Sequence, residues 1–116
     1  MQHAALSLER WSLLSVDQQI LAVANEMNRA SKLFSAENRH RLTNCYERIL
    51  RLVDLTVETD TRPGFRRELL RWRELAAELY SSPNPDLEQH GAAFKALLLL
   101  HPVAARQIPL VLGGSR

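Results

Sequence analysis

The sequence has one cysteine, Cys45, and no apolar run of the roughly 20 residues that a membrane-spanning helix requires. A single cysteine excludes a framework of intramolecular disulfides. The first residues also lack the basic stretch and the following apolar stretch of a secretory signal peptide. We therefore expect a cytoplasmic protein that has no membrane-spanning segment.

A strong excess of one charge is also missing. The 116 residues include 15 basic and 13 acidic side chains, for a formal net charge of +2. This near balance gives no strong overall field that would attract nucleic acid. Hydrophobic residues make up 46% of the chain and charged residues 24%, which is typical of a folded globular protein. The length predicts a single domain over residues 1–116.

Glycine and proline are absent from Met1 to Arg62, so this half of the chain lacks the usual signals for tight turns between strands. No stretch shows the sustained alternation of apolar and polar residues that is typical of a half-buried strand. We predict an all-α fold, an antiparallel bundle of four main helices with a short N-terminal lead-in helix and an irregular C-terminal tail.

Apolar residues recur every three or four positions along several stretches, the spacing of amphipathic helices. The main helices are predicted over residues 16–33, 36–58, 64–80 and 85–100, after a lead-in helix within 6–14 and before a tail with one or two further turns at 102–107. No glycine or proline separates the first two main helices, so one continuous helix is an alternative. The predicted core includes Ile20, Met27, Ile49, Val53, Leu69, Trp72, Phe94 and Leu98.

Local signals mark the predicted helix starts. Ser15 and Gln18 have the spacing of a capping box, in which each side chain satisfies a free backbone N–H group. Ser35 is the expected N-cap of the second main helix. Asn84 as N-cap with Pro85 in the first helical position predicts the start of the fourth.

Few residues are candidates for catalysis or metal binding. Glu37 and His40 have the i, i+3 spacing found in di-iron helical bundles, but they form only one such pair. Cys45 falls on a predicted apolar stripe, which favours a core position. Glycine-rich phosphate loops, nucleophile elbows and Cys-x-x-Cys pairs are absent from the sequence. We therefore expect no metal, no cofactor and no catalytic residues.

The fourth predicted helix ends in four consecutive leucines, which make it apolar on every side. Such a helix needs a cover on all sides, supplied either by the terminal segments of the chain or by a second copy. We predict a non-catalytic interaction or oligomerisation module, with a second copy in a homodimer, or another protein, as its partner. The predicted interface residues are Leu97, Leu99, Leu100, Leu110 and Leu112.

The alternative is a nucleic-acid-binding or regulatory bundle that uses arginines to contact phosphates. Arg41, Arg48 and Arg51, with Asn44 between them, have a spacing that predicts one outward-facing stripe. Interleaved acidic residues disfavour this function, because pairs such as Glu47 with Arg51 and Arg71 with Glu74 have the spacing of ion pairs along a helix. The candidate residues are Arg41, Arg48, Arg51, Arg66, Arg67 and Arg71.

Overall fold

The computed structural model describes residues 7–60 and 62–100, and every regular element in this part of the chain is a helix. The elements are α1 (Leu8–Trp11), α2 (Val16–Ala30), the short 3-10 helix η1 (Ala36–Asn38), α3 (Arg39–Thr59), α4 (Pro63–Ser81) and α5 (Leu87–Leu98). The all-α prediction of four main helices with a short lead-in helix is confirmed. The predicted tail and the turns at 102–107 lie outside the described residues.

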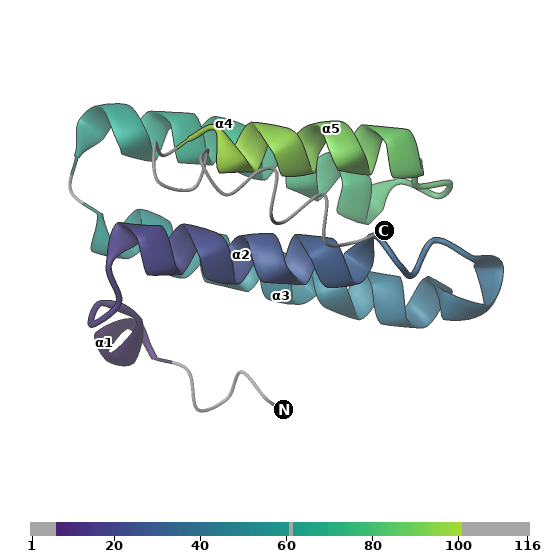
Figure 1. Ribbon diagram of the computed structural model, residues 1–116, viewed down its shortest axis with the longest axis horizontal. Coiled ribbons are helices and arrows are strands. Elements are labelled where there is room, and N and C mark those ends of the chain that lie inside the picture. Colours follow the sequence, from purple (N-terminus) through teal and green to yellow (C-terminus); the bar gives the residue numbers. More distant parts are fainter. Residues whose placement is uncertain (1–6, 61, 101–116) are drawn as a thin grey trace.

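The four main helices form two layers (Figure 1). α2 and α3 make one layer, α4 and α5 make the other, and helices that follow each other in the chain run antiparallel. α2 packs on α3, α3 on α4, α4 on α5, and α5 returns to α2. In this closed arrangement each main helix packs against two of the other three, and α3 also contacts α1.

The core lies between the two layers. All eight residues predicted to be in the core are at most 3% exposed. They come from all four main helices, as amphipathic stripes that face one another should. The buried cluster also includes Trp11 of α1.

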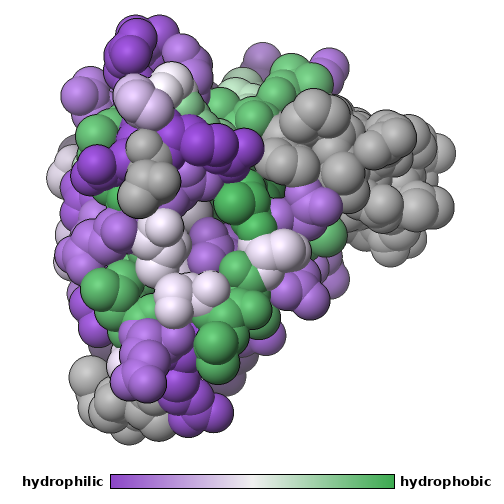
Figure 2. Space-filling model, turned by 90° about the vertical axis from the view of Figure 1, so that its left-hand side faces the viewer, coloured by the Kyte–Doolittle hydropathy of each residue, from purple (hydrophilic) through white to green (hydrophobic). Residues whose placement is uncertain are grey.

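Helix α1 is fixed to the bundle by polar contacts of its last residue. The indole N–H of Trp11 donates to the hydroxyl oxygen of Thr56 on α3 at 2.9 Å. The side-chain amide of Gln19 on α2 donates to the Trp11 carbonyl at 3.0 Å. Figure 2 views this end of the molecule, where several apolar patches are separated by hydrophilic side chains.

The helices on either side of Ser35 are separate, which excludes the single continuous helix. The Ser15 capping box has both of its hydrogen bonds, and α2 ends at Ala30 rather than at residue 33. Ser35 precedes η1 but its side chain does not cap a backbone N–H group; its hydroxyl accepts a hydrogen bond from the Asn38 amide instead. The chain leaves α2 without a glycine because the C-cap residue, Ser31, keeps right-handed helical backbone angles. Beyond it, Phe34 packs its ring edge-on against His90 of α5.

The start of α5 differs from the prediction. Asp86, not Asn84, is the N-cap, and its carboxylate accepts a hydrogen bond from the Glu88 backbone N–H at 2.9 Å. Asn84 lies in the preceding loop, where its backbone N–H donates to the Ser82 hydroxyl. The prediction of Asn84 as N-cap with Pro85 in the first helical position is therefore wrong. Asp and Asn both favour N-caps, so the residue type alone does not identify the cap.

Gly91 lies inside α5, and a Cβ atom built on it would meet nothing within 4 Å. Glycine within a helix costs about 0.5–1 kcal/mol relative to alanine, because it loses more backbone freedom on folding. We expect Gly91→Ala to raise the free energy of unfolding by about this amount, measured by urea denaturation. A decrease in stability would show that alanine meets a contact at this position.

Candidate interaction surfaces

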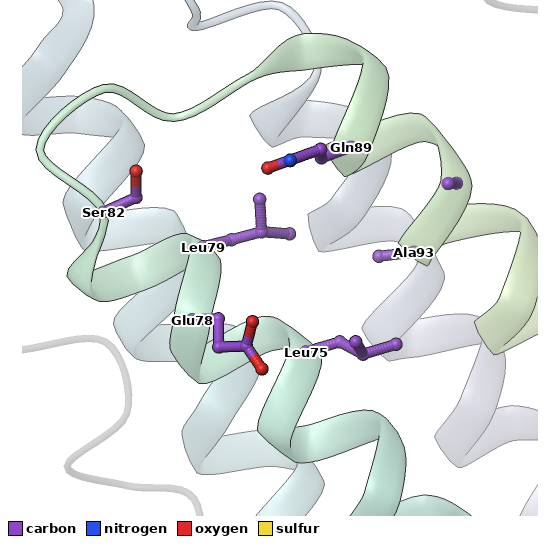
Figure 3. Close-up of a pocket in the computed structure, with 7 residues that line it drawn as sticks. Leu75, Glu78, Leu79, Ser82, Gln89 and Ala93 are labelled. Atoms are coloured by element: carbon purple, nitrogen blue, oxygen red, sulfur yellow. The ribbon is translucent and has the colours of Figure 1, made fainter.

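An apolar groove runs along the outer side of the second layer, between α4 and α5. It consists of two hollows of about 480 and 340 Å³ that share Leu75. The first is lined by Leu75, Glu78, Leu79, Ser82, Gln89, Ala92 and Ala93 (Figure 3), and the second by Glu68, Arg71, Trp72, Leu75, Ala96, Leu99 and Leu100. Together these residues define the α4–α5 groove.

Side-chain size explains why the groove is open. In Figure 3 the Leu79 side chain points into the gap between the helices, while α5 lines the gap with Gln89 and with the short side chain of Ala93. Leu75 and Leu99 remain 44% and 60% exposed on its sides. Large apolar side chains gathered in this way are typical of a surface that contacts another macromolecule.

The predicted interface leucines have different positions. Leu99 and Leu100 line the second hollow. Leu97 is fully buried within this chain, so its assignment to an exposed surface is wrong. It lies seven residues after His90, on the helix face that packs into the core, and four consecutive leucines hid this difference in the sequence. Leu110 and Leu112 lie outside the described residues.

Sequence reasoning missed the contribution of α4 to this surface. The buried apolar stripe of α4 consists of Leu69, Trp72, Ala76 and Leu79. Leu75 falls beside this stripe rather than on it, and it is half-exposed. Only the packing of α4 against α5 shows that Leu75 and Leu79 lie next to the small residues of α5. A leucine just outside a regular stripe is the only sequence signal for such a surface.

The candidate arginines do not form one outward face. The Arg48 side chain is 17% exposed, and its Nε–H donates to Glu26 of α2 at 2.9 Å. The prediction that Arg48 faces outward with Arg41 and Arg51 is therefore wrong. The reason is that α2 covers this side of α3 and supplies a carboxylate that binds the guanidinium group.

The arginines of α4 have other surroundings. Arg71 pairs with Glu68 at 3.6 Å rather than with Glu74. Glu47 of α3 is the residue whose spacing suggested an ion pair with Arg51. It accepts a hydrogen bond from the Tyr80 hydroxyl of α4 at 3.0 Å. Arg51, Arg66 and Arg67 are exposed. The six candidates thus lie on several sides of α3 and α4.

Two of the candidates, Arg41 and Arg48, do meet in one place. They line a hollow of about 300 Å³ between α2 and α3, together with Arg29, Leu33, Asn44 and Cys45. The sequence did not reveal the role of Arg29, because α2 and α3 are brought together only by the fold. We call this the α2–α3 pocket.

The remaining candidates for chemistry have ordinary positions. Cys45 is buried, as predicted, and burial raises the pKa of its thiol above the usual 9.0, which keeps it protonated near neutral pH. Glu37 and His40 are exposed. Within residues 7–60 and 62–100, no three His, Cys, Asp or Glu side chains gather where they could hold a metal ion. Nor is any helix of this part long and apolar enough to cross a membrane.

A buried histidine that we did not predict connects three helices. His90 of α5 is fully buried, with its Nε2 atom 2.8 Å from the Met27 carbonyl and its Nδ1 atom 2.6 Å from the Tyr46 hydroxyl. A carbonyl oxygen only accepts, so Nε2 carries the proton and Nδ1 accepts from Tyr46. The sequence indicated this position, because His90, Phe94 and Leu97 lie four and three residues apart and therefore share one face of the helix.

Comparison with protein-family models, with curated proteins and with solved structures finds no significant match.

Proposed function

We propose that this protein is a non-catalytic interaction module that forms a homodimer through the α4–α5 groove. The observation that carries the proposal is the apolar groove itself, with Leu75 at its centre and Leu99 60% exposed at one end. A second copy would cover these side chains, and their removal from water would favour association by about 25 cal/mol per Å² of apolar surface. In a dimer with twofold symmetry, the groove of each copy would contact the groove of the other.

Charges on the groove support a second copy as the occupant. Arg71, Leu75 and Glu78 lie four and three residues apart, so they share one face of α4. If two α4 helices cross antiparallel with a twofold axis near Leu75, then Arg71 of each copy lies next to Glu78 of the other. The groove is therefore complementary to itself in charge as well as in apolar character.

The dispersed arginines disfavour nucleic acid as the main partner. Phosphate contacts need basic side chains that follow a common backbone path. Arg48 lies between α3 and α2 beside Glu26, whereas Arg71 lies on α4 beside Glu68, so these arginines do not follow one path. A protein partner for the groove fits these observations better.

The assembly state tests the proposal. We expect light scattering to give twice the 13.2 kDa mass of the chain at micromolar concentration. Leu75→Glu and Leu99→Glu should each give a monomer, because either substitution places a charge inside the apolar contact. Both positions are exposed within one chain, so circular dichroism should show that the helices of the variants are intact.

Leu13→Glu is the matched control. Leu13 is 83% exposed beside α1, outside the α4–α5 groove, so this variant should stay dimeric. Charge exchange gives a second check. Arg71→Glu should weaken the dimer, and adding Glu78→Arg in the same chain should restore it. A monomeric wild-type protein, or equal dissociation by Leu13→Glu, would contradict the proposal.

A further inference from the structure

The α2–α3 pocket combines basic side chains with an apolar surface. Arg29 and Leu33 reach it from α2 and the segment that follows, and Arg41, Asn44 and Cys45 reach it from α3. Its volume of about 300 Å³ is enough for a small organic molecule. The pocket lies in the layer opposite the α4–α5 groove, so it is independent of the proposed dimer.

The charges in this pocket are not balanced. Glu26 is the carboxylate that meets the arginines: it accepts from Arg48 at 2.9 Å and pairs with Arg29 at 3.4 Å. Arg41 has no ion-pair partner within the described part of the chain. Three guanidinium groups against one carboxylate leave an excess of two positive charges.

One of the guanidinium groups is held in place before any ligand binds. The Nε–H of Arg48 donates to Glu26, and an Nη2–H donates to the Cys45 sulfur at 3.4 Å. These two contacts fix the plane of the group while leaving further N–H donors of its five unused. A fixed guanidinium group loses less side-chain freedom on binding, and its fork of donors matches the oxygens of a phosphate.

We propose that the α2–α3 pocket binds a phosphate monoester. A phosphate monoester carries between about one and a half and two negative charges near neutral pH, which matches the excess charge of the pocket. Its oxygens would accept from Arg29, Arg41 and Arg48, and the Asn44 side chain adds a neutral polar group. Its organic part would lie against Leu33 and the buried Cys45.

Phenyl phosphate is a suitable probe because it joins a dianion to a compact apolar ring. We expect a titration of the full chain, followed by amide chemical shifts at physiological ionic strength, to give saturable changes at Asn44 and Cys45. Arg41→Gln should weaken binding about tenfold, the loss expected for one charge-assisted contact. Arg41 is exposed, so this variant should fold normally.

Arg51→Gln is the matched control, since Arg51 is an exposed arginine of the same helix that does not line the pocket. It should bind phenyl phosphate as the wild-type protein does. Inorganic phosphate should bind more weakly than phenyl phosphate, because it has no group to place against Leu33. The absence of saturable changes, or equal weakening by Arg41→Gln and Arg51→Gln, would overturn the site. Equal affinity for inorganic phosphate would overturn the assignment of a monoester.

Discussion

Replacing His90 with alanine is expected to lower the free energy of unfolding by at least about 3 kcal/mol. The imidazole is fully buried, and it connects α5 to the Met27 carbonyl of α2 and to the Tyr46 hydroxyl of α3. Truncation leaves that hydroxyl buried without its acceptor, at a cost of about 1–3 kcal/mol, and opens a cavity as well. Urea denaturation followed by circular dichroism measures the change; a loss below about 0.5 kcal/mol, typical of surface sites, would contradict the prediction.

The same histidine should make stability depend on pH. Burial lowers the pKa of His90 below the usual 6.5, against an opposing hydrogen bond to the Met27 carbonyl. The unfolded chain then binds the proton more readily than the folded chain, so the free energy of unfolding falls as the pH drops below 6.5. The contribution of Asp60, whose pKa the Arg62 guanidinium lowers from 3.8, is lost only at more acidic pH.

Two variants separate the effect of His90 from that of the other groups. His90→Gln keeps a polar side chain without a titrating ring, so its urea midpoint should change little between about pH 7 and 5, where unperturbed carboxylates stay ionised. His40→Gln removes an exposed histidine of α3 and should keep the full decline of the wild-type protein. A decline that persists in His90→Gln would assign the pH dependence to another group.

Local signals in the sequence were sufficient for most of the fold. The Ser15 capping box predicted the start of α2, and the apolar stripes predicted which residues of each main helix face the core. The error at the start of α5 arose because two nearby residues are similarly favourable as N-caps. Asp86 and Asn84 both favour an N-cap, and α5 begins after Asp86 rather than after Asn84.

The surfaces were harder to predict, because they depend on contacts between helices. The position of Arg48 is decided by Glu26 on a different helix, and the α2–α3 pocket also needs Arg29 from that helix. Leu97 and Leu99 look equivalent in a run of four leucines, yet a turn of 100° per residue buries the first and exposes the second. The spacing of residues along the sequence predicts which of them share a helix face. Which other helix that face contacts is decided only by the fold.

Truncation of Trp72 is expected to have the other large effect. Trp72 of α4 is 3% exposed, its indole N–H donates to the Ala93 carbonyl of α5 at 2.8 Å, and its ring lines the α4–α5 groove. Trp72→Ala should lower the free energy of unfolding by about 3–5 kcal/mol, through the lost apolar contacts and the cavity that remains. Variants must be compared at one protein concentration, because the stability of the proposed dimer would depend on it.

Trp72→Phe is the matched variant, since it removes the indole N–H but keeps an aromatic ring at the same position. It should lower the free energy of unfolding by less than Trp72→Ala does, and equal losses would mean that the hydrogen bond to Ala93 outweighs packing.

Either variant leaves Trp11 as the single tryptophan of the chain. Because Trp11 is buried and hydrogen-bonded to Thr56 of α3, its fluorescence should change at the same urea concentration as the helical signal. An earlier fluorescence change would show that α1 detaches from α3 before the four-helix bundle unfolds.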